Sequence, residues 1–207
     1  MPARIWIRMA VPADAGEVRS LFAAHLSALG LRPDPALDAD MEDFPLGYDR
    51  PGAHFLVAEA PTGALVGMAG LLEGEIRRVF VDPHWRGQGI AKRLVMTLIG
   101  EQSRQEDQAA RGGLGAPEPV GRGAASVETS RGSLLKPADE TLSHLGQSFV
   151  ARLADRFQET SPGSGVPRLW AVVGCANEAS RRLFEACGFV PSGRTPAHLL
   201  MQHCVVL

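Results

Sequence analysis

The feature that most constrains this chain of 207 residues is a glycine-containing segment, RGQGIA at residues 86–91, between two strongly patterned stretches. Before it, EIRRVFV at residues 75–81 is rich in β-branched and aromatic residues and is followed by Asp-Pro, which is typical of a strand and its end. After it, apolar residues recur at helical spacing from about Gly89 to beyond residue 100. The sequence therefore predicts a strand, a short loop and a helix in direct succession.

Glycines at a strand-to-helix junction allow several backbone N–H groups to point into one concavity, and the start of the helix adds partial positive charge. This arrangement predicts an anion site, at which Arg86 can add charge-assisted hydrogen bonds to a phosphate or pyrophosphate. A P-loop requires Gly-Lys followed by Ser or Thr, and the sequence has no Gly-Lys. A dinucleotide-binding fold is disfavoured because Lys92 stands where GxGxxG requires its third glycine. The residues alone leave the phosphate ligand open.

The remaining patterns predict further strands and helices around this junction. We expect strands at residues 4–10, 54–60, 64–73, 168–173 and 198–207, and helices at about residues 14–30 and 177–187. Pro-Thr-Gly between the second and third of these strands predicts a tight antiparallel turn. In the strand at 75–81 we expect Ile76 and Phe80 on one face and Val79 and Val81 on the other, as in a strand covered on both sides.

The segment after the first long helix differs in composition from the rest of the chain. Residues 111–133 are dominated by Gly, Ser and Pro and have too little apolar surface to offset the entropy of ordering. An apolar stripe then predicts another helix at residues 138–159. We therefore expect a single domain over residues 1–207 with a flexible insertion at 106–137.

Composition and charge exclude several classes of function. The formal net charge is −2 with both signs spread along the chain, so the basic stripe that nucleic acid requires is absent. Cys175, Cys187 and Cys204 lack the spacing of a metal site or a disulfide framework, and we expect no metal. The apolar runs are too short to cross a membrane. We expect a cytoplasmic protein.

Two motifs in order resemble the GNAT acyltransferase superfamily. Its signature Arg/Gln-x-x-Gly-x-Gly/Ala is matched by Arg86, Gly89 and Ala91, and its later Asn-x-x-Ala/Ser helix ending in Gly-Phe is matched at residues 177–189. The resemblance implies an α/β fold with a mixed, mostly antiparallel sheet flanked by helices. It places the Gly-rich insertion before the later strand, and it opens the sheet between residues 75–81 and 168–173.

The resemblance also implies acetyl-CoA as co-substrate. In the family this loop holds the pyrophosphate, which here assigns cofactor binding to Arg86, Gly87, Gln88, Gly89, Ile90 and Ala91. The backbone of Val79, Phe80 and Val81 would pair with the pantetheine amides. Two roles are open for Asn177, because it can contact the cofactor or cap the helix that follows.

The implied reaction is N-acetylation of a primary amine on a small molecule or peptide. An amine with a pKa of ~10.4 is protonated at pH 7, so a base must remove its proton. Glu75 stands where family members that acetylate lysine place a catalytic glutamate, but a solvated turn residue is the alternative. Phe184 occupies the position of the family's proton-donating tyrosine, so a non-catalytic acyl-CoA sensor is the alternative function. We expect Cys187 and His25 to pack rather than to react.

Acidic residues concentrate between the first helix and the hairpin, in a region that lines the acceptor site in the family. They are Asp34, Asp38, Asp40, Glu42 and Asp43. A cationic acceptor would suit them, and a solvated acidic loop is the alternative interpretation. A C-terminal edge strand could pair with a second subunit, so a homodimer is left open.

Overall fold

The structure is a computed structural model that describes residues 4–34, 38–42, 44–112 and 169–203. The strands are β1 (Trp6–Met9), β2 (His54–Glu59), β3 (Leu65–Leu72), β4 (Glu75–Val81), β5 (Leu169–Gly174), β6 (Phe189–Arg194) and β7 (His198–His203). The α-helices are α1 (Ala15–Ala28), α2 (Ala39–Glu42), α3 (Ile90–Gly112) and α5 (Glu178–Glu185). Single 3₁₀ turns lie at Pro12–Asp14, Leu46–Tyr48 and Pro83–Trp85.

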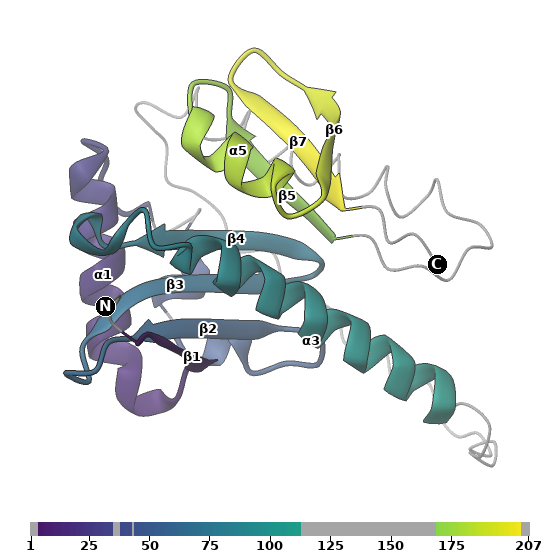
Figure 1. Cartoon of the computed structure of the whole chain (residues 1–207), viewed down its shortest axis with the longest axis horizontal. Coiled ribbons are helices and arrows are strands. Elements are labelled where there is room, and N and C mark those ends of the chain that lie inside the picture. Colours follow the sequence, from purple (N-terminus) through teal and green to yellow (C-terminus); the bar gives the residue numbers. More distant parts are fainter. Residues whose placement is uncertain (1–3, 35–37, 43, 113–168, 204–207) are drawn as a thin grey trace, which may run out of the picture. The chain divides into compact units, whose positions relative to one another are not determined.

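Among the described residues the strands form one seven-stranded sheet in the order β1-β2-β3-β4-β5-β7-β6 (Figure 1). Every neighbouring pair is antiparallel except β4 and β5, which are parallel. Those two strands share one register pair, Glu75 with Trp170, at the beginning of both strands. The predicted mixed, mostly antiparallel sheet with flanking helices is confirmed, and Val79–Val81 have no register partner in β5.

Each face of the sheet carries its own hydrophobic core. On one face, α3 and α5 cover the strands, with Leu94 and Leu98 of α3 fully buried and Phe184 of α5 nearly so (Figure 1). On the other face, Val18 and Phe22 of α1 pack against the opposite side chains of β2, β3 and β4. Because β4 is covered on both sides, side chains from either core can be held rigidly along it.

A β-bulge in β4 changes the alternation that the sequence predicts. Arg77 pairs with Gly70 and Phe80 pairs with Met68, so Arg78 and Val79 together oppose one residue of β3. Arg78 has a φ of 56°, in the left-handed region that few non-glycine residues adopt. The extra residue reverses the alternation, so Ile76 lies in the core of Val81 and opposite to Phe80. The predicted grouping of Ile76 with Phe80 is therefore wrong.

One helix and two strands differ from the sequence-based expectations. The helix α3 continues to Gly112, so residues 106–112, at the start of the predicted insertion, are helical. A strand that was not predicted, β6, follows α5 and forms the edge of the sheet. Its Pro191 has no backbone N–H to donate, which an edge strand tolerates. The last strand, β7, lies between β5 and β6 and is not an edge.

The rest of the predicted insertion, residues 113–137, and the helix predicted at 138–159 lie outside the described residues. No helix in the described part of the chain is both long and apolar enough to cross a membrane.

Candidate active site

The predicted phosphate loop forms a glycine turn between β4 and α3. Gly87 and Gly89 have φ angles of +76° and +74°, which side chains rarely tolerate. A Cβ atom built at either glycine would have nothing within 4 Å, so the space beside this backbone is open. Before the loop, Asp82 accepts a hydrogen bond from the His84 N–H at 2.8 Å and fixes the 3₁₀ turn at the end of β4. The open space and the positive φ angles together make a concave stretch of backbone.

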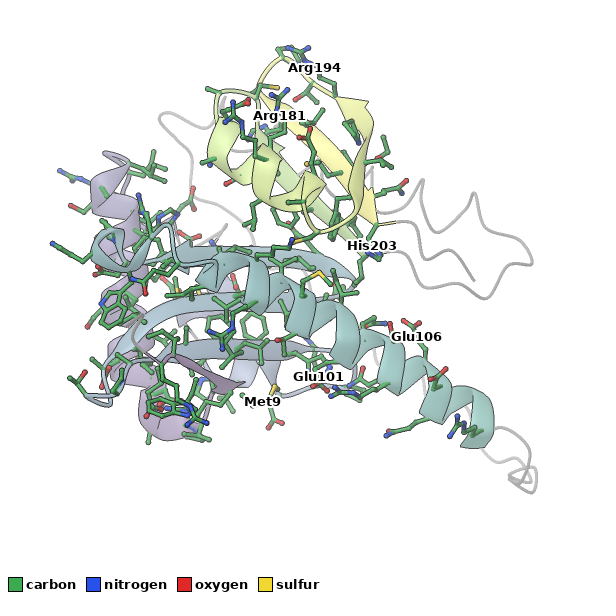
Figure 2. All side chains as sticks on the ribbon, viewed as in Figure 1. Met9, Glu101, Glu106, Arg181, Arg194 and His203 are labelled. Atoms are coloured by element: carbon green, nitrogen blue, oxygen red, sulfur yellow. The ribbon has the colours of Figure 1, made fainter. Side chains whose placement is uncertain are left out.

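The electrostatics of this loop favour an anion. Within the described ranges, the backbone N–H groups of Gly87, Gln88 and Gly89 have no acceptor. The long helix α3 begins directly after them and has no acidic residue in its first turn. The acidic side chains Glu101 and Glu106 lie further along α3, away from its first turn (Figure 2). The loop therefore offers free donors in a region of positive potential.

Arg86 holds the end of β4 against the loop. Its Nε donates to the Val81 carbonyl at 2.9 Å, and its guanidinium carbon lies 5.8 Å from the centre of the Phe80 ring. These contacts fix the direction in which the chain leaves the strand. They also occupy the Val81 carbonyl, one of the backbone groups predicted to pair with pantetheine.

Replacing Gly89 with alanine is expected to weaken acetyl-CoA binding more than it weakens folding. The strain of a side chain at positive φ costs about 1–2 kcal/mol of stability, and the added methyl group also enters the open space of the loop. Gly63 is the matched control, because its φ is +85° and a Cβ there also has nothing within 4 Å, but it lies in the turn between β2 and β3. Calorimetric titration and thermal unfolding of both variants check this. Equal affinity in the two variants would contradict the assignment of the loop.

Glu75 is a partly buried carboxyl group at the point where β4 and β5 meet. Its side chain is 17% exposed, and its carboxylate lies 3.8 Å from an Arg77 guanidinium nitrogen. Burial raises the pKa of Glu75 above its ordinary value, although the positive charges of Arg77 and Arg78 oppose the rise. The alternative of a solvated turn residue does not describe this position.

The acidic segment before β2 is neutralised by arginines of β4. Because of the bulge, Arg77 and Arg78 both turn toward this segment. Arg78 donates to Asp38 at 2.7 Å and to Asp40 at 3.1 Å, and Arg77 lies 3.4 Å from Asp40. Tyr48 completes the cluster by donating to Asp40 at 2.7 Å.

The two interpretations of the acidic segment are therefore both wrong for Asp38 and Asp40. These side chains are only 9% and 6% exposed, so they form neither a solvated loop nor an open anionic surface. Two adjacent arginines in a strand that is apolar apart from Glu75 were the signal in the sequence that buried acids would face them. The Asp34 N–H donates to the Asp38 carboxylate at 2.9 Å, Glu42 is exposed, and Asp43 is outside the described residues.

Asn177 caps α5. Its Oδ1 accepts a hydrogen bond from the Ser180 N–H at 3.0 Å, which is the geometry of a helix cap. One of the two predicted roles is thus present, and a contact with a cofactor stays a prediction.

Three residues, Phe184, Cys187 and His25, have packing roles in the structure. Phe184 is 4% exposed and packs edge-on against Phe189, with ring centres 5.0 Å apart. Cys187 is buried, and burial raises the pKa of its thiol. His25 lies 4.6 Å from Phe80, and its pKa is lowered by burial and then by the charges of Arg86 and Arg78. In the described part of the chain no group of three potential ligand side chains is placed to hold a metal.

Comparison with known proteins finds a matching domain model and solved structures with the same fold. Residues 51–120, which include β2 to β4, the loop and all of α3, match the acetyltransferase (GNAT) domain model. The chain is similar in structure to a putative acetyltransferase from Acinetobacter baylyi ADP1, with 13% identity, 98% and 93% of the two chains covered and a TM-score of 0.59. No curated protein sequence matches the chain.

Two further solved structures show the same fold. An acetyltransferase of the GNAT family from Staphylococcus aureus Mu50 has 12% identity, coverage of 97% and 98%, and a TM-score of 0.57. A phosphinothricin acetyltransferase from Sinorhizobium meliloti, solved with acetyl-CoA, has 19% identity, coverage of 98% and 88%, and a TM-score of 0.53. The chain has the fold of the GNAT acetyltransferases, and the resemblance identified in its sequence is confirmed.

Proposed function

We propose that the chain is an acetyl-CoA-dependent N-acetyltransferase that transfers the acetyl group directly to a primary amine. The observation that carries this proposal is the loop at residues 86–91. It presents free N–H groups and two positive-φ glycines at the start of α3, directly after a strand whose last residues have no register partner in β5. Free N–H donors at a helix start suit a pyrophosphate. The strand that precedes them offers a surface on which an extended thioester arm can lie.

The cofactor would use backbone groups more than side chains. The N–H groups of Gly87 to Ala91 would hold the pyrophosphate, with Arg86 fixing the loop through Val81. The backbone of Val79–Val81, which has no register partner in β5, would pair with the pantetheine amides through groups other than the Val81 carbonyl, which accepts from Arg86. Asn177 would contribute from the start of α5 while also capping that helix.

Glu75 would act as the general base. The acceptor amine arrives as an ammonium ion and must lose a proton before its lone pair can attack the thioester carbonyl. A carboxylate with a raised pKa binds that proton better than an exposed one. Attack forms a tetrahedral oxyanion that strand amides can stabilise, and collapse of this intermediate breaks the C–S bond. The thiol has a pKa of ~8.5, so it can leave as a thiolate without the tyrosine that Phe184 replaces.

The acceptor would be a small-molecule or peptide amine. Solved structures with this fold include spermidine and phosphinothricin acetyltransferases, which differ in the charge of their acceptors. In this chain Asp38 and Asp40 are paired with Arg78, so they supply little attraction for a polycation. A cytoplasmic location belongs to the same proposal. A homodimer would have to pair through another part of the chain than the C-terminal strand, because β7 lies between β5 and β6.

Calorimetric titration of acetyl-CoA tests the cofactor assignment. We expect saturable binding by the wild-type protein and none by an Arg86→Ala, Gly89→Asp double variant that keeps its far-ultraviolet circular dichroism. Binding of equal strength in the two proteins would contradict the proposal, and so would no binding by folded wild type.

A sensor that binds acyl-CoA without turnover is the second candidate. The observation that favours it is Phe184, which is buried and offers no hydroxyl group for proton transfer. The two functions differ in whether an amine releases CoA from the bound acetyl-CoA, because a sensor has no turnover to lose.

A further inference from the structure

One guanidinium group of β4 lies between two carboxylates that have different roles. Arg77 places its Nη1 atom 3.8 Å from a Glu75 carboxylate oxygen and its Nη2 atom 3.4 Å from an Asp40 carboxylate oxygen. Glu75 is the proposed base, whereas Asp40 belongs to α2, is 6% exposed and has no role in the reaction proposed above. The Arg77 side chain thus connects the acidic segment before β2 to the base.

The two distances show that Arg77 interacts differently with the two carboxylates. At 3.8 Å the contact with Glu75 is too long to be a hydrogen bond, so Glu75 experiences the positive charge without donating a lone pair to it. Asp40 is closer to Arg77 and also accepts a hydrogen bond from Arg78 at 3.1 Å. The negative charge of Asp40 therefore offsets both arginines of β4 at the place where they act on Glu75.

The packing around Asp40 fixes its carboxylate beside Arg77. Tyr48 donates to Asp40 at 2.7 Å, and a Cβ atom built on Gly70 of β3 would come within 2.6 Å of the Tyr48 hydroxyl oxygen. Gly70 is the register partner of Arg77, so a glycine at this position leaves space for the Tyr48 ring. A Cβ atom on Gly47 would lie 3.0 Å from the Asp40 carbonyl oxygen, so the backbone of α2 is also closely packed.

Charged side chains act on Glu75 from three parts of the chain. Arg77 and Arg78 belong to its own strand, Asp40 to α2 and Glu73 to the turn between β3 and β4, and its register partners on β3 and β5 are uncharged. Burial is the largest cause of the raised pKa of Glu75; the two arginines oppose it, and Asp40 and Glu73 support it. The Glu73 side chain is 74% exposed, so solvent screens its charge. Asp40 is the buried carboxylate that limits the effect of the arginines.

We propose that Asp40 is a positioning residue for Glu75, which keeps the Arg77 guanidinium from pairing closely with the base and so leaves the Glu75 carboxylate able to take the proton of the acceptor amine. Its catalytic consequence rests on the proposed function, whereas the coupling between the two carboxylates does not. Without the charge of Asp40, Arg77 can form a closer ion pair with Glu75, which favours the ionised form and makes Glu75 a weaker base.

Titration of Glu75 in an Asp40→Asn variant tests the coupling without requiring turnover. The carboxyl carbon of isotope-labelled glutamate is followed by NMR spectroscopy as a function of pH, and Glu75→Gln identifies the resonance. We expect the midpoint of the Glu75 titration to move to lower pH in Asp40→Asn. The acidic limb of kcat/KM should move in the same direction, and its plateau should be lower because a weaker base accepts the proton less readily.

Tyr48→Phe separates the charge of Asp40 from the packing around it. This variant keeps the aromatic ring and the Asp40 carboxylate but loses one hydrogen bond of the cluster, so it should unfold more readily without displacement of the Glu75 titration. Arg77→Gln tests the same coupling from the other side, and Asp40 keeps Arg78 as a partner in this variant. We expect the Glu75 midpoint to move to higher pH in Arg77→Gln. Thermal unfolding and circular dichroism establish that each variant is folded.

Two results would overturn the proposal. The first is a Glu75 titration that folded Asp40→Asn or folded Arg77→Gln leaves unchanged. The second is an equal displacement in Tyr48→Phe and Asp40→Asn, which would attribute the effect to loosened packing rather than to charge.

The NMR and kinetic readouts separate this inference from the proposed function. A displaced Glu75 titration in a protein that shows no amine-dependent turnover supports the coupling and removes the acetyltransferase proposal. Wild-type turnover, with a Glu75 titration and a pH profile that are the same in Asp40→Asn, removes the coupling and leaves the proposed function standing.

Discussion

Replacement of Glu75 by glutamine is expected to lower kcat by about 10²–10⁴-fold, the usual contribution of a general base, while the affinity for acetyl-CoA stays unchanged. Glutamine keeps the shape of the side chain but cannot accept the proton of the acceptor ammonium ion. Initial rates of amine-dependent CoA release and calorimetric titration of acetyl-CoA measure the two quantities. A variant that retains wild-type turnover would show that Glu75 is not the base.

The pH dependence provides a second readout of Glu75. Because burial raises its pKa, kcat/KM of the wild type should rise with pH through a value above the ordinary pKa of a glutamate, and the Glu75→Gln profile should lack that limb. Folding stability should respond in the opposite sense. Between the unfolded and folded pKa values the native state binds more protons, so stability falls as pH rises through this window. The glutamine variant should therefore be at least as stable as wild type at pH 7.

Glu59→Gln is the matched control for this substitution. Glu59 is also a partly buried glutamate of the sheet, but it lies on β2 and pairs with Arg8 at 2.6 Å. We expect normal turnover from this variant. Loss of turnover in both variants would indicate a general effect of removing sheet carboxylates rather than a role in proton transfer.

Replacement of Asp40 by asparagine is expected to reduce the free energy of unfolding by about 3 kcal/mol, the cost of removing one partner of a buried ion pair. Asparagine has the same shape and can still accept the Tyr48 hydrogen bond, but it leaves Arg78 and Arg77 with less compensating charge. Urea unfolding measures the effect. Asp49→Asn is the control, because Asp49 is exposed in the same segment and should change stability by less than about 0.5 kcal/mol.

The effect of Asp40 should depend on pH. Burial alone would raise the pKa of Asp40, but the hydrogen bond from Arg78 and the charges of Arg77 and Arg78 outweigh it and lower the pKa. Its contribution is therefore complete above the unfolded pKa of about 3.9 and is lost as pH falls through the folded value. The gap between wild type and Asp40→Asn should be constant near pH 7 and narrow only below about pH 4. A constant gap at all pH values would contradict the ion-pair explanation.

The strand, loop and helix around residues 86–91 could be predicted because each part has a strong local signal. Alternating and helical apolar patterns fix the element types, and glycine adopts the φ angles found at Gly87 and Gly89 without the strain that a side chain brings. The β2–β3 hairpin followed from its turn residues in the same way. These features depend on neighbours in the sequence, so a single sequence contains the information that determines them.

The features that could not be predicted depend on contacts between distant residues. The bulge at Arg78 requires the partner strand β3, and it moves a cation onto the face of Asp38 and Asp40 about forty positions earlier in the sequence. The strand β6 contains Pro191, which argues against a strand until its edge position is known. The burial of Glu75 likewise depends on β5, which is contributed by a segment nearly one hundred residues away.

Amine-dependent release of CoA is the measurement that tests the central claim most directly. The protein is incubated with acetyl-CoA and a panel of primary amines that includes polyamines, amino acids and lysine peptides, and the free thiol is followed with time. The proposed function predicts thiol release that requires both the protein and at least one amine, with an equal amount of the N-acetyl product by mass spectrometry. Saturable acetyl-CoA binding without release for any amine in the panel would contradict the acetyltransferase proposal and support a binding module.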